Sequence, residues 1–389
     1  MTSTEWRATL GLSAVYALRM FGLFMVLPAF APYAARLDGG DFALLVGLAL
    51  GVYGLTQAVC QIPFGLASDR FGRKPVIVAG MAIFAAGSVL AGTADTIAGL
   101  IAGRALQGAG AITAAAAALV ADVTRPQVRT MAMAILGAGM GAAFVIALVA
   151  GPPIAGLIGV DGILVGAGVL SVAAIAVVIW VVPASPAARA ESSALGPVLR
   201  NTDLWHLHGG IFLLHALLTA SFVLFPGIFE RALSLDVTAQ WRIYLPVMVG
   251  ALAVVLPLMR WADLRGRVRE LLAGAVVTLL AACLLVGLGT RGVPILIAGI
   301  ALYFTAFNYL EGALPSLVSR RAPDESRGAA LGLYATAQFL GAFCGGLLGG
   351  TVAGLGDWAG NGFVLLAILP LLWCTFVFRL QPERPHAST

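Results

Sequence analysis

The chain has 389 residues, of which 60% are apolar and only 11% are charged. An ordinary soluble domain carries about a quarter charged residues, so this composition excludes a soluble globule. One bilayer span takes about 20 apolar residues, and the length allows about twelve spans with short loops. The net charge of +5 comes as small basic clusters between apolar runs, which indicates cytoplasmic loops and not nucleic-acid binding.

The apolar runs predict six helices in the first half of the chain, at residues 9–32, 43–65, 75–94, 97–120, 131–157 and 161–183. A polar stretch with several prolines and serines follows, and we interpret residues 184–203 as a cytoplasmic linker. Six further helices are predicted at residues 204–229, 241–259, 270–290, 293–318, 328–353 and 359–379. The predicted domains are therefore a six-helix bundle over residues 1–183 and a second one over residues 204–389.

Charge placement predicts the orientation of this bundle in the membrane. If the N-terminus is inside, only a few of the 23 Lys and Arg residues fall in outer segments, namely Arg36, Arg231, Arg242 and Arg291. The positive-inside rule then places both termini in the cytoplasm. Glu5 and Arg7 precede the first apolar run without a cleavage site, so we expect this helix to be retained. The chain ends soon after Arg379, and we expect no appended cytosolic domain.

An internal repeat supports two homologous halves. Four residues recur at one constant offset, with Pro63, Asp69, Gly72 and Arg73 returning as Pro257, Asp263, Gly266 and Arg267. Parallel repeats of six helices are a known transporter architecture, with the substrate site near mid-membrane. We therefore expect an all-α membrane protein with twelve transmembrane helices in two pseudo-symmetric six-helix bundles.

The strongest local motif is Gly65-Leu-Ala-Ser-Asp-Arg-Phe-Gly-Arg-Lys74, in the expected loop between the second and third helices. It closely resembles the loop signature of the major facilitator superfamily, and Arg104-Ala-Leu-Gln-Gly108 resembles that superfamily's second motif. The resemblance covers essentially the whole chain and is nearest to the drug:proton antiporter branch, in particular the YajR-like exporters. It implies the superfamily's fold, a bacterial inner-membrane location and a cytoplasmic gating motif. The gating residues are Gly65, Asp69, Arg70, Gly72, Arg73, Lys74, Asp122, Asp263 and Arg267, and the alternative is a generic solvated basic turn.

The predicted fifth helix is rich in small residues and resembles the antiporter motif of the same family. Small residues let helices pack closely, and a proline permits a bend that neighbouring helices satisfy. General helix packing without any antiport role explains the pattern equally well. The residues concerned are Gly141, Gly151, Pro152 and Gly156.

Ionisable residues inside spans cost about 3 kcal/mol or more at the bilayer centre unless they are paired or face water. The first half contains two, Arg19 and Arg104. Helical spacing puts polar residues on the same faces, and we expect these faces to line one polar cavity. Because the first helix holds Arg19 and no carboxylate, the cavity should favour anionic or neutral amphipathic compounds. Internal pairing or snorkelling of the arginines is the alternative. The cavity candidates here are Tyr16, Arg19, Tyr53, Gln57, Gln61, Arg104 and Gln107.

The second half contains His215 and Glu311 inside predicted spans. Imidazole titrates near neutrality, and a carboxyl removed from water can do so too, so either group is a candidate proton carrier. A satisfied buried histidine is the alternative for His215, and a structural partner of a nearby arginine cluster is the alternative for Glu311. The polar residues expected beside them are Asn308, Tyr334 and Gln338.

Transport is the function class that remains. The P-loop motif needs Gly-Lys-Ser/Thr, whereas Lys74 follows Gly-Arg and precedes proline. No enzyme or metal motif lies inside the spans, so we expect no enzyme activity, cofactor or metal. We predict proton-coupled export of a small amphipathic or anionic compound by alternating access; a lipid flippase, uptake symporter or uniporter of the same fold is the alternative. The expected partners are a small-molecule substrate, protons and the lipid bilayer, with no nucleic acid and a monomeric chain.

Overall fold

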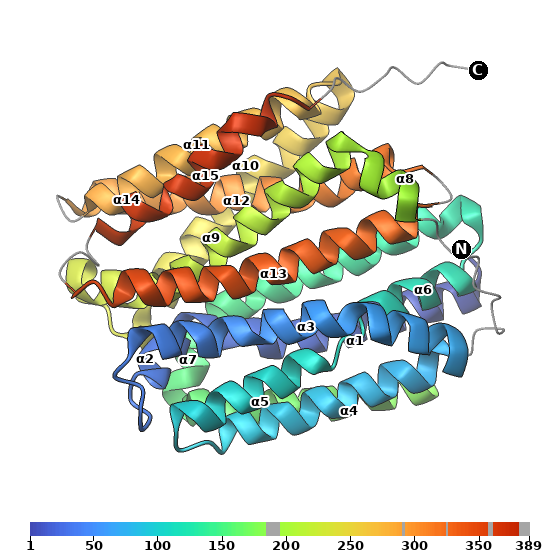
Figure 1. The fold of residues 1–389 in the computed structure, drawn as a ribbon, viewed down its shortest axis with the longest axis horizontal. Helices are drawn as coiled ribbons and strands as arrows, with labels where there is room; N and C mark the ends of the chain where they lie inside the picture. The colour runs from blue at the N-terminus through green and yellow to red at the C-terminus, as the bar shows by residue number, and fades with distance from the viewer. Residues whose placement is uncertain (184–194, 290–291, 324–325, 357–360, 381–389) are drawn as a thin grey trace. The chain divides into compact units, whose positions relative to one another are not determined.

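The computed structural model describes residues 1–183, 195–289, 292–323, 326–356 and 361–380, and these form helices (Figure 1). The first half contains α1 (Ser3–Met25), α2 (Leu27–Ala34), α3 (Ala43–Phe71), α4 (Arg73–Gly92), α5 (Ile97–Ala109), α6 (Thr113–Val123) and α7 (Pro126–Trp180). The second contains α8 (Leu195–Arg200), α9 (Thr202–Leu233), the short η1 (Val237–Ala239), α10 (Trp241–Arg265), α11 (Val268–Leu288), α12 (Val293–Arg321), α13 (Arg327–Ala353), α14 (Gly362–Leu366) and α15 (Ile368–Val377). Of the predicted linker, residues 184–194 lie outside the described part, and α8 follows them.

Ten helical segments of the described chain are long and apolar enough to cross a membrane. One of them is α7, whose 55 residues would extend about 80 Å at 1.5 Å per residue, far more than a bilayer core. It is interrupted at Gly159 (φ 73°, ψ 169°), where a Cβ would lie 2.0 Å from Asp161 Oδ1. The two arms of α7 are the helices predicted at 131–157 and 161–183. Counting both arms and the shorter apolar pair α14–α15 gives the twelve expected helices.

The predicted helix at 97–120 is broken in two, which corrects the sequence expectation. α5 ends at Ala109 and α6 begins at Thr113, and Gly110 has a non-helical ψ of 55°. Glycine is needed there because a Cβ on Gly110 would lie 2.3 Å from the carbonyl oxygen of Gly80. Close contact with the neighbouring helix therefore fixes the position of the break, and hydropathy alone gives no sign of it.

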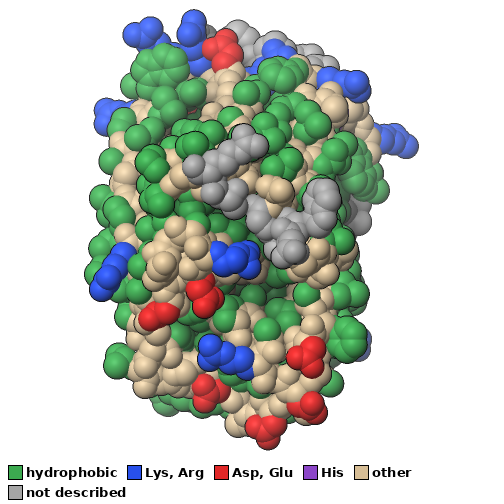
Figure 2. Space-filling model, turned by 90° about the vertical axis from the view of Figure 1, so that its left-hand side faces the viewer, with side chains coloured by type: hydrophobic (Ala, Val, Ile, Leu, Met, Phe, Trp, Pro, Cys, Tyr) green, Lys and Arg blue, Asp and Glu red, His purple; other side chains and the backbone are tan. Residues whose placement is uncertain are grey.

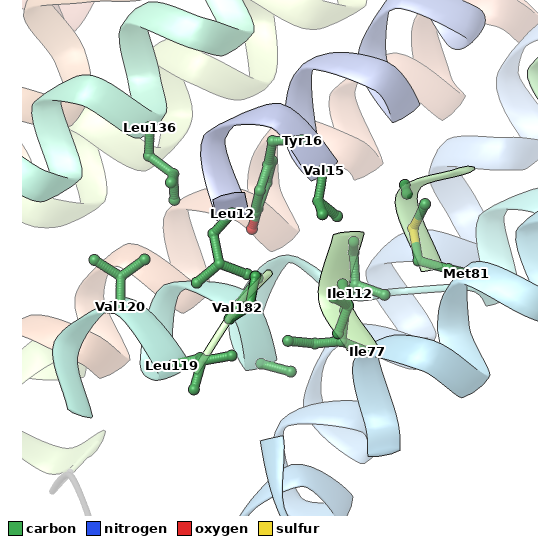
Figure 3. Packing of buried hydrophobic residues seen from close by; sticks show 14 of the residues in the cluster. Leu12, Val15, Tyr16, Ile77, Met81, Ile112, Leu119, Val120, Leu136 and Val182 are labelled. Atoms are coloured by element: carbon green, nitrogen blue, oxygen red, sulfur yellow. The ribbon is translucent and has the colours of Figure 1, made fainter. Parts of the chain in front are cut away.

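The described chain forms two compact units. The first contains Met1–Ser192, Thr219–Arg242 and Ala342–Gly354. Within it, α1 packs on α7, α4 packs on both α5 and α7, and α3 packs on α5. Figure 3 shows part of its core, where Tyr16 from α1 lies among apolar side chains that include Ile112, Leu119 and Leu136. This core supports the broken α5–α6 segment.

The second unit contains Ser193–Leu218, Ile243–Gly341 and Leu355–Thr389. In it, α11 packs on α12, α14 and α15. Gly210 of α9 lies so close to Trp373 that a Cβ would be 2.6 Å from the indole. The small residue thus allows α9 and α15 to approach within this unit.

The two ends of the first unit differ in charge. The end formed by the α2–α3 turn, the α4–α5 turn and the Gly159 break carries exposed acidic residues, namely Asp38, Asp41, Asp95 and Asp161. Figure 2 faces this end and shows acidic side chains (red) gathered over its lower part. The opposite end holds basic residues that include Arg70, Lys74 and Arg129. Such asymmetry is what the positive-inside rule describes.

Candidate functional site

The motif segment Gly65–Lys74 is helical almost throughout, which corrects the expectation of a loop. α3 continues to Phe71, and only Gly72 leaves the helical region before α4 begins at Arg73. Gly72 has φ 93° and ψ 151°, a conformation that strains any residue with a Cβ. The chain therefore changes direction at this one glycine, and the end of α3 lies against the start of α4.

Arg73 is the centre of an ionic network at this turn. Its Nη1 donates to Ser68 Oγ at 2.7 Å and pairs with Asp69, and its Nε donates to Asp122 Oδ2 at 3.0 Å. The side chains of Arg73 and Asp122 are only 13% and 16% exposed, so water screens this pair weakly. The network thereby fastens the end of α6 to the α3–α4 turn.

Replacing Arg73 with alanine is expected to destabilise the protein by about 2–3 kcal/mol, because two neighbouring carboxylates lose their shared counter-charge. The matched control is Arg70→Ala, since Arg70 is exposed and stacks on Phe71 at 5.3 Å; its loss should cost less than about 1 kcal/mol. Thermal unfolding of the two purified variants measures the difference. Equal midpoints would contradict a stabilising role for Arg73.

The second copy of the motif also forms ion pairs at the corresponding turn, but its acid and its arginine have different partners. Gly266 again has a positive φ, 64°. Asp263 accepts a hydrogen bond from Arg320 Nη2 at 2.9 Å, so the acid now lies on α10 and the base at the end of α12. Arg267 pairs instead with Glu270 at 3.3 Å. These side chains are about half exposed, so this copy is more accessible to solvent than the first.

Other polar contacts also occur twice, at comparable places in the two halves of the chain. An acid at the start of α1 or α9 pairs with an arginine just after α6 or at the end of α12. An arginine near the start of α7 or α13 donates to a carbonyl oxygen eight residues earlier. The matching contacts are Glu5–Arg125 with Asp203–Arg321, and Arg129–Ala121 with Arg327–Ser319. The duplication is therefore visible in side-chain contacts as well as in the sequence.

Arg19 lies at the centre of a buried polar cluster in the first unit. Its Nη2 donates to Tyr53 Oη at 3.0 Å, to Gln57 Oε1 at 2.8 Å and to the carbonyl oxygen of Gly110 at 3.0 Å. The guanidinium carbon lies 5.2 Å from the centre of the Phe84 ring. Its Nε and Nη1 are buried, and no described residue forms a hydrogen bond with them.

Arg104 adjoins the same cluster. Its Nη1 donates to Gln107 Oε1 at 2.9 Å, and the amide of Gln107 donates in turn to Ser88 Oγ at 2.7 Å. The guanidinium carbon lies 5.1 Å from the Tyr53 ring centre and 5.4 Å from that of Phe30. Tyr53 therefore contacts both arginines, through its hydroxyl and its ring.

The seven candidates in the first half come together but are closed off from solvent. Tyr16 donates to the carbonyl oxygen of Thr113 at 2.7 Å, and Gln57 donates to Gln61 Oε1 at 3.4 Å. None of the seven is more than 5% exposed. The polar faces expected from helical spacing meet, and in this structure they form a packed cluster around the break between α5 and α6.

The second unit brings His215, Glu311 and Gln338 together. Gln338 Nε2 lies 2.8 Å from His215 Nε2 and donates to Glu311 Oε1 at 3.3 Å, while His215 Nε2 lies 3.8 Å from Glu311 Oε2. The side chain of Glu311 is 37% exposed, although it lies in the middle of α12. The amide of Gln338 therefore links the imidazole of His215 to the carboxyl of Glu311.

The other two candidates in this half differ in position. Tyr334 is buried, and its hydroxyl has no hydrogen-bond partner among the residues that the structure describes. Asn308 donates to the carbonyl oxygen of Phe304 at 2.7 Å and lies 3.8 Å from Met248 Sδ. The amide of Asn308 therefore bonds within its own helix and contacts a methionine.

The small residues of the predicted fifth helix have different surroundings. A Cβ on Gly151 would lie 2.3 Å from the carbonyl oxygen of Met25, and one on Gly156 would lie 2.9 Å from Thr238 Cγ2. Gly141 has no such neighbour within 4 Å. The helix continues through Pro152, and the non-helical residue of α7 is Gly159, which lies between the helices predicted at 131–157 and 161–183.

Sequence reasoning missed the aromatic and small residues that complete the first cluster: Phe30, Phe84, Ser88, Gly110 and Thr113. An apolar run in the sequence gives no sign whether its aromatic residues pack on lipid or on a guanidinium. Ser88 gave a usable signal, because it is the polar residue of an otherwise apolar stretch of α4.

Comparison with known proteins gives one family. The sequence model of the Major Facilitator Superfamily matches residues 12–310 and 232–389. The chain is 42% identical over 395 residues to the inner membrane transport protein YajR of Escherichia coli K12, covering 100% of this chain and 86% of YajR. It is 25% identical over 339 residues to the multidrug resistance protein MdtH of Aeromonas salmonicida, covering 86% of this chain and 85% of MdtH.

Solved structures of low sequence identity share the fold. The human organic anion transporter MFSD10 superimposes with a TM-score of 0.72 at 19% identity, covering 98% of this chain and 100% of the other. The nucleoside transporter NupG gives a TM-score of 0.73 at 14% identity, covering 96% and 99%. At such identities the likeness concerns the arrangement of helices and not the substrate.

Proposed function

Because the chain belongs to the Major Facilitator Superfamily, we propose that it is a proton-coupled transporter that exports a small amphipathic or anionic compound by alternating access. It is a secondary transporter, a multi-pass membrane protein and not an enzyme. It resembles an inner membrane transport protein along its whole length, which places it in a bacterial inner membrane. The similarity to a multidrug resistance protein supports export as the direction.

The observation that carries the substrate class is the pair of buried guanidinium groups, Arg19 and Arg104. Each is 2% exposed or less, and neither forms an ion pair with a carboxylate of the described residues. Two uncompensated positive charges create a positive potential in their half of the protein. The aromatic rings of Phe30, Tyr53 and Phe84 pack on these groups and suit an amphipathic passenger.

The proton is assigned to His215 and Glu311. The two groups lie within 4 Å of each other, and Gln338 contacts both. Binding of a proton here changes the charge of a site within the membrane, and such a change biases the balance between two conformations. Proton entry and passenger binding then use different units of the chain.

The transport cycle we propose is a rocking of two bundles, residues 1–183 and 204–389, about a cytoplasmic linker at 184–203. Both termini lie in the cytoplasm in this proposal, which the basic end of the first unit supports. The ionic network of Asp69, Arg73 and Asp122 lies at that end and acts as the cytoplasmic latch.

A compound panel tests this function. Cells that lack or overproduce the protein are compared for susceptibility to antimicrobial compounds, with and without a proton uncoupler. Overproduction should lower susceptibility to anionic or neutral amphipathic compounds, and the uncoupler should remove this protection. Unchanged susceptibility across antimicrobial, sugar and lipid-precursor classes would contradict export and favour a flippase or an uptake carrier.

A further inference from the structure

The break between α5 and α6 leaves a helix start buried within the first unit. The first N–H groups of any helix have no acceptor within it, and they carry the positive end of the helix dipole. The N-cap residue of α6 is Ile112, and no side chain of the described ranges caps this N-terminus. An anion near such a helix start is stabilised by both the amides and the dipole.

Arg19 reaches this same break from α1. Its Nη2 donates to the carbonyl oxygen of Gly110, which lies between the two helices, and Gln57 bridges from Arg19 to Thr113 Oγ1 at 3.4 Å. The helix start and the guanidinium are therefore two independent donors at one place. The side chain of Arg19 is 0% exposed.

The hydrogen bonds of Arg19 are unevenly distributed. Three neutral oxygens share Nη2, whereas Nε and Nη1 are buried and have no partner within the described part of the chain. No carboxylate of the described residues forms an ion pair with this guanidinium. A buried charge is costly unless it is paired and hydrogen-bonded, so the cluster is incomplete without an anion.

We propose that the carboxylate group of an organic anion binds at the α5–α6 break, held by Arg19 and the first amides of α6. This assignment rests on the proposed transport function and names its substrate class as apolar monocarboxylates. Apolar groups beside the site favour such a ligand, since Phe84 packs under Arg19, and Tyr53 and Phe30 pack on the second guanidinium, that of Arg104. When the carboxylate binds, it replaces part of the hydrogen bonding between Nη2 and the three neutral oxygens.

The test uses benzoate and its neutral counterpart benzamide on the purified full chain. Thermal unfolding is recorded at increasing ligand concentration and constant ionic strength. Benzoate should raise the unfolding midpoint and benzamide should not, because only the carboxylate pairs with Arg19. Arg19→Gln should raise the benzoate concentration needed for a given midpoint shift by about tenfold or more, which corresponds to about 1.4 kcal/mol of binding free energy. Arg36→Gln, which removes an exposed arginine, should leave the response unchanged.

A second variant covers the case in which Arg19→Gln does not fold. Gln57→Glu places a carboxylate 2.8 Å from Arg19 Nη2 with almost no change in shape. It should raise the midpoint without ligand and abolish the benzoate response. Gln127→Glu is the control, since Gln127 is an exposed glutamine outside the cluster, and it should keep the response.

Three results would overturn the assignment: equal effects of benzoate and benzamide, a full benzoate response in Gln57→Glu, or an equal effect of sodium chloride at the same concentration. The last would show an inorganic anion site only. Because this assay needs neither flux nor a proton gradient, it separates the two proposals. Benzoate binding without export would contradict the proposed function alone, and export without benzoate binding would contradict this site alone.

Discussion

The double variant His215→Ala/Glu311→Gln is expected to lose all flux driven by a proton gradient in proteoliposomes. Gln338 lies 2.8 Å from His215 Nε2 and 3.3 Å from Glu311 Oε1, so a proton gained by one group changes the hydrogen bonding of the other. Each single variant leaves one of the two proposed proton carriers, and only the double variant removes both. The measurement is uptake of a transported compound into vesicles with an imposed pH gradient, and the expected rate is that of protein-free vesicles.

Exchange of substrate without a pH gradient should survive in this double variant, because our proposal places the passenger site in the first unit. Retained exchange also shows that the variant is folded. Asn308→Ala is the matched control, since Asn308 lies one turn from Glu311 on α12 but bonds to the carbonyl oxygen of Phe304. A double variant with undiminished gradient-driven flux would show that other groups carry the proton.

Gly47→Val is expected to abolish transport by preventing the conformation seen here. In the first unit, α3 and the Ala342–Gly354 part of α13 meet through glycines. A Cβ on Gly47 would lie 2.1 Å from the carbonyl oxygen of Gly346, and one on Gly346 would lie 2.4 Å from that of Gly47. Both clashes involve backbone atoms, so rotation of a side chain cannot relieve them. In our proposal, α3 and α13 belong to opposite bundles, and their contact must form and break in each cycle.

Gly137→Val is the control for this prediction. Gly137 is also a helical glycine of the first unit, and a Cβ there would meet nothing within 4 Å. Flux in proteoliposomes measures the effect, and size-exclusion chromatography separates a trapped conformation from a misfolded chain. Wild-type flux for Gly47→Val would mean that the contact between α3 and α13 is not needed for transport.

The positions of the helices were predictable because each span is a local property of composition. The runs at 43–65 and 75–94 correspond to α3 and α4, and the run at 328–353 corresponds to α13 within one residue. Helix ends near the motif were less accurate, because α3 continues through the charged residues to Phe71. Polar residues at the membrane surface remain helical at no cost, so polarity is a poor guide to where a helix ends there.

Part of the polar cluster was also predictable from helical spacing. Residues three or four apart share a face, and Arg104 and Gln107 do form a hydrogen bond of 2.9 Å. Gln57 and Gln61 are likewise in contact. Spacing within one helix cannot say which faces of different helices meet, so the joint contact of Tyr53 with Arg19 and Arg104 was visible only in three dimensions.

The sequence by itself determined a membrane-embedded chain of about twelve helices, its duplication and the small set of buried charges. These follow from hydropathy and residue identity, which are read one segment at a time. Only the tertiary structure decided that α5 and α6 are separate, that Arg19 lies at their junction and that Gln338 joins His215 to Glu311. The physical reason is that backbone breaks and side-chain partners depend on how closely neighbouring helices approach, and this approach is set by packing between segments far apart in the chain.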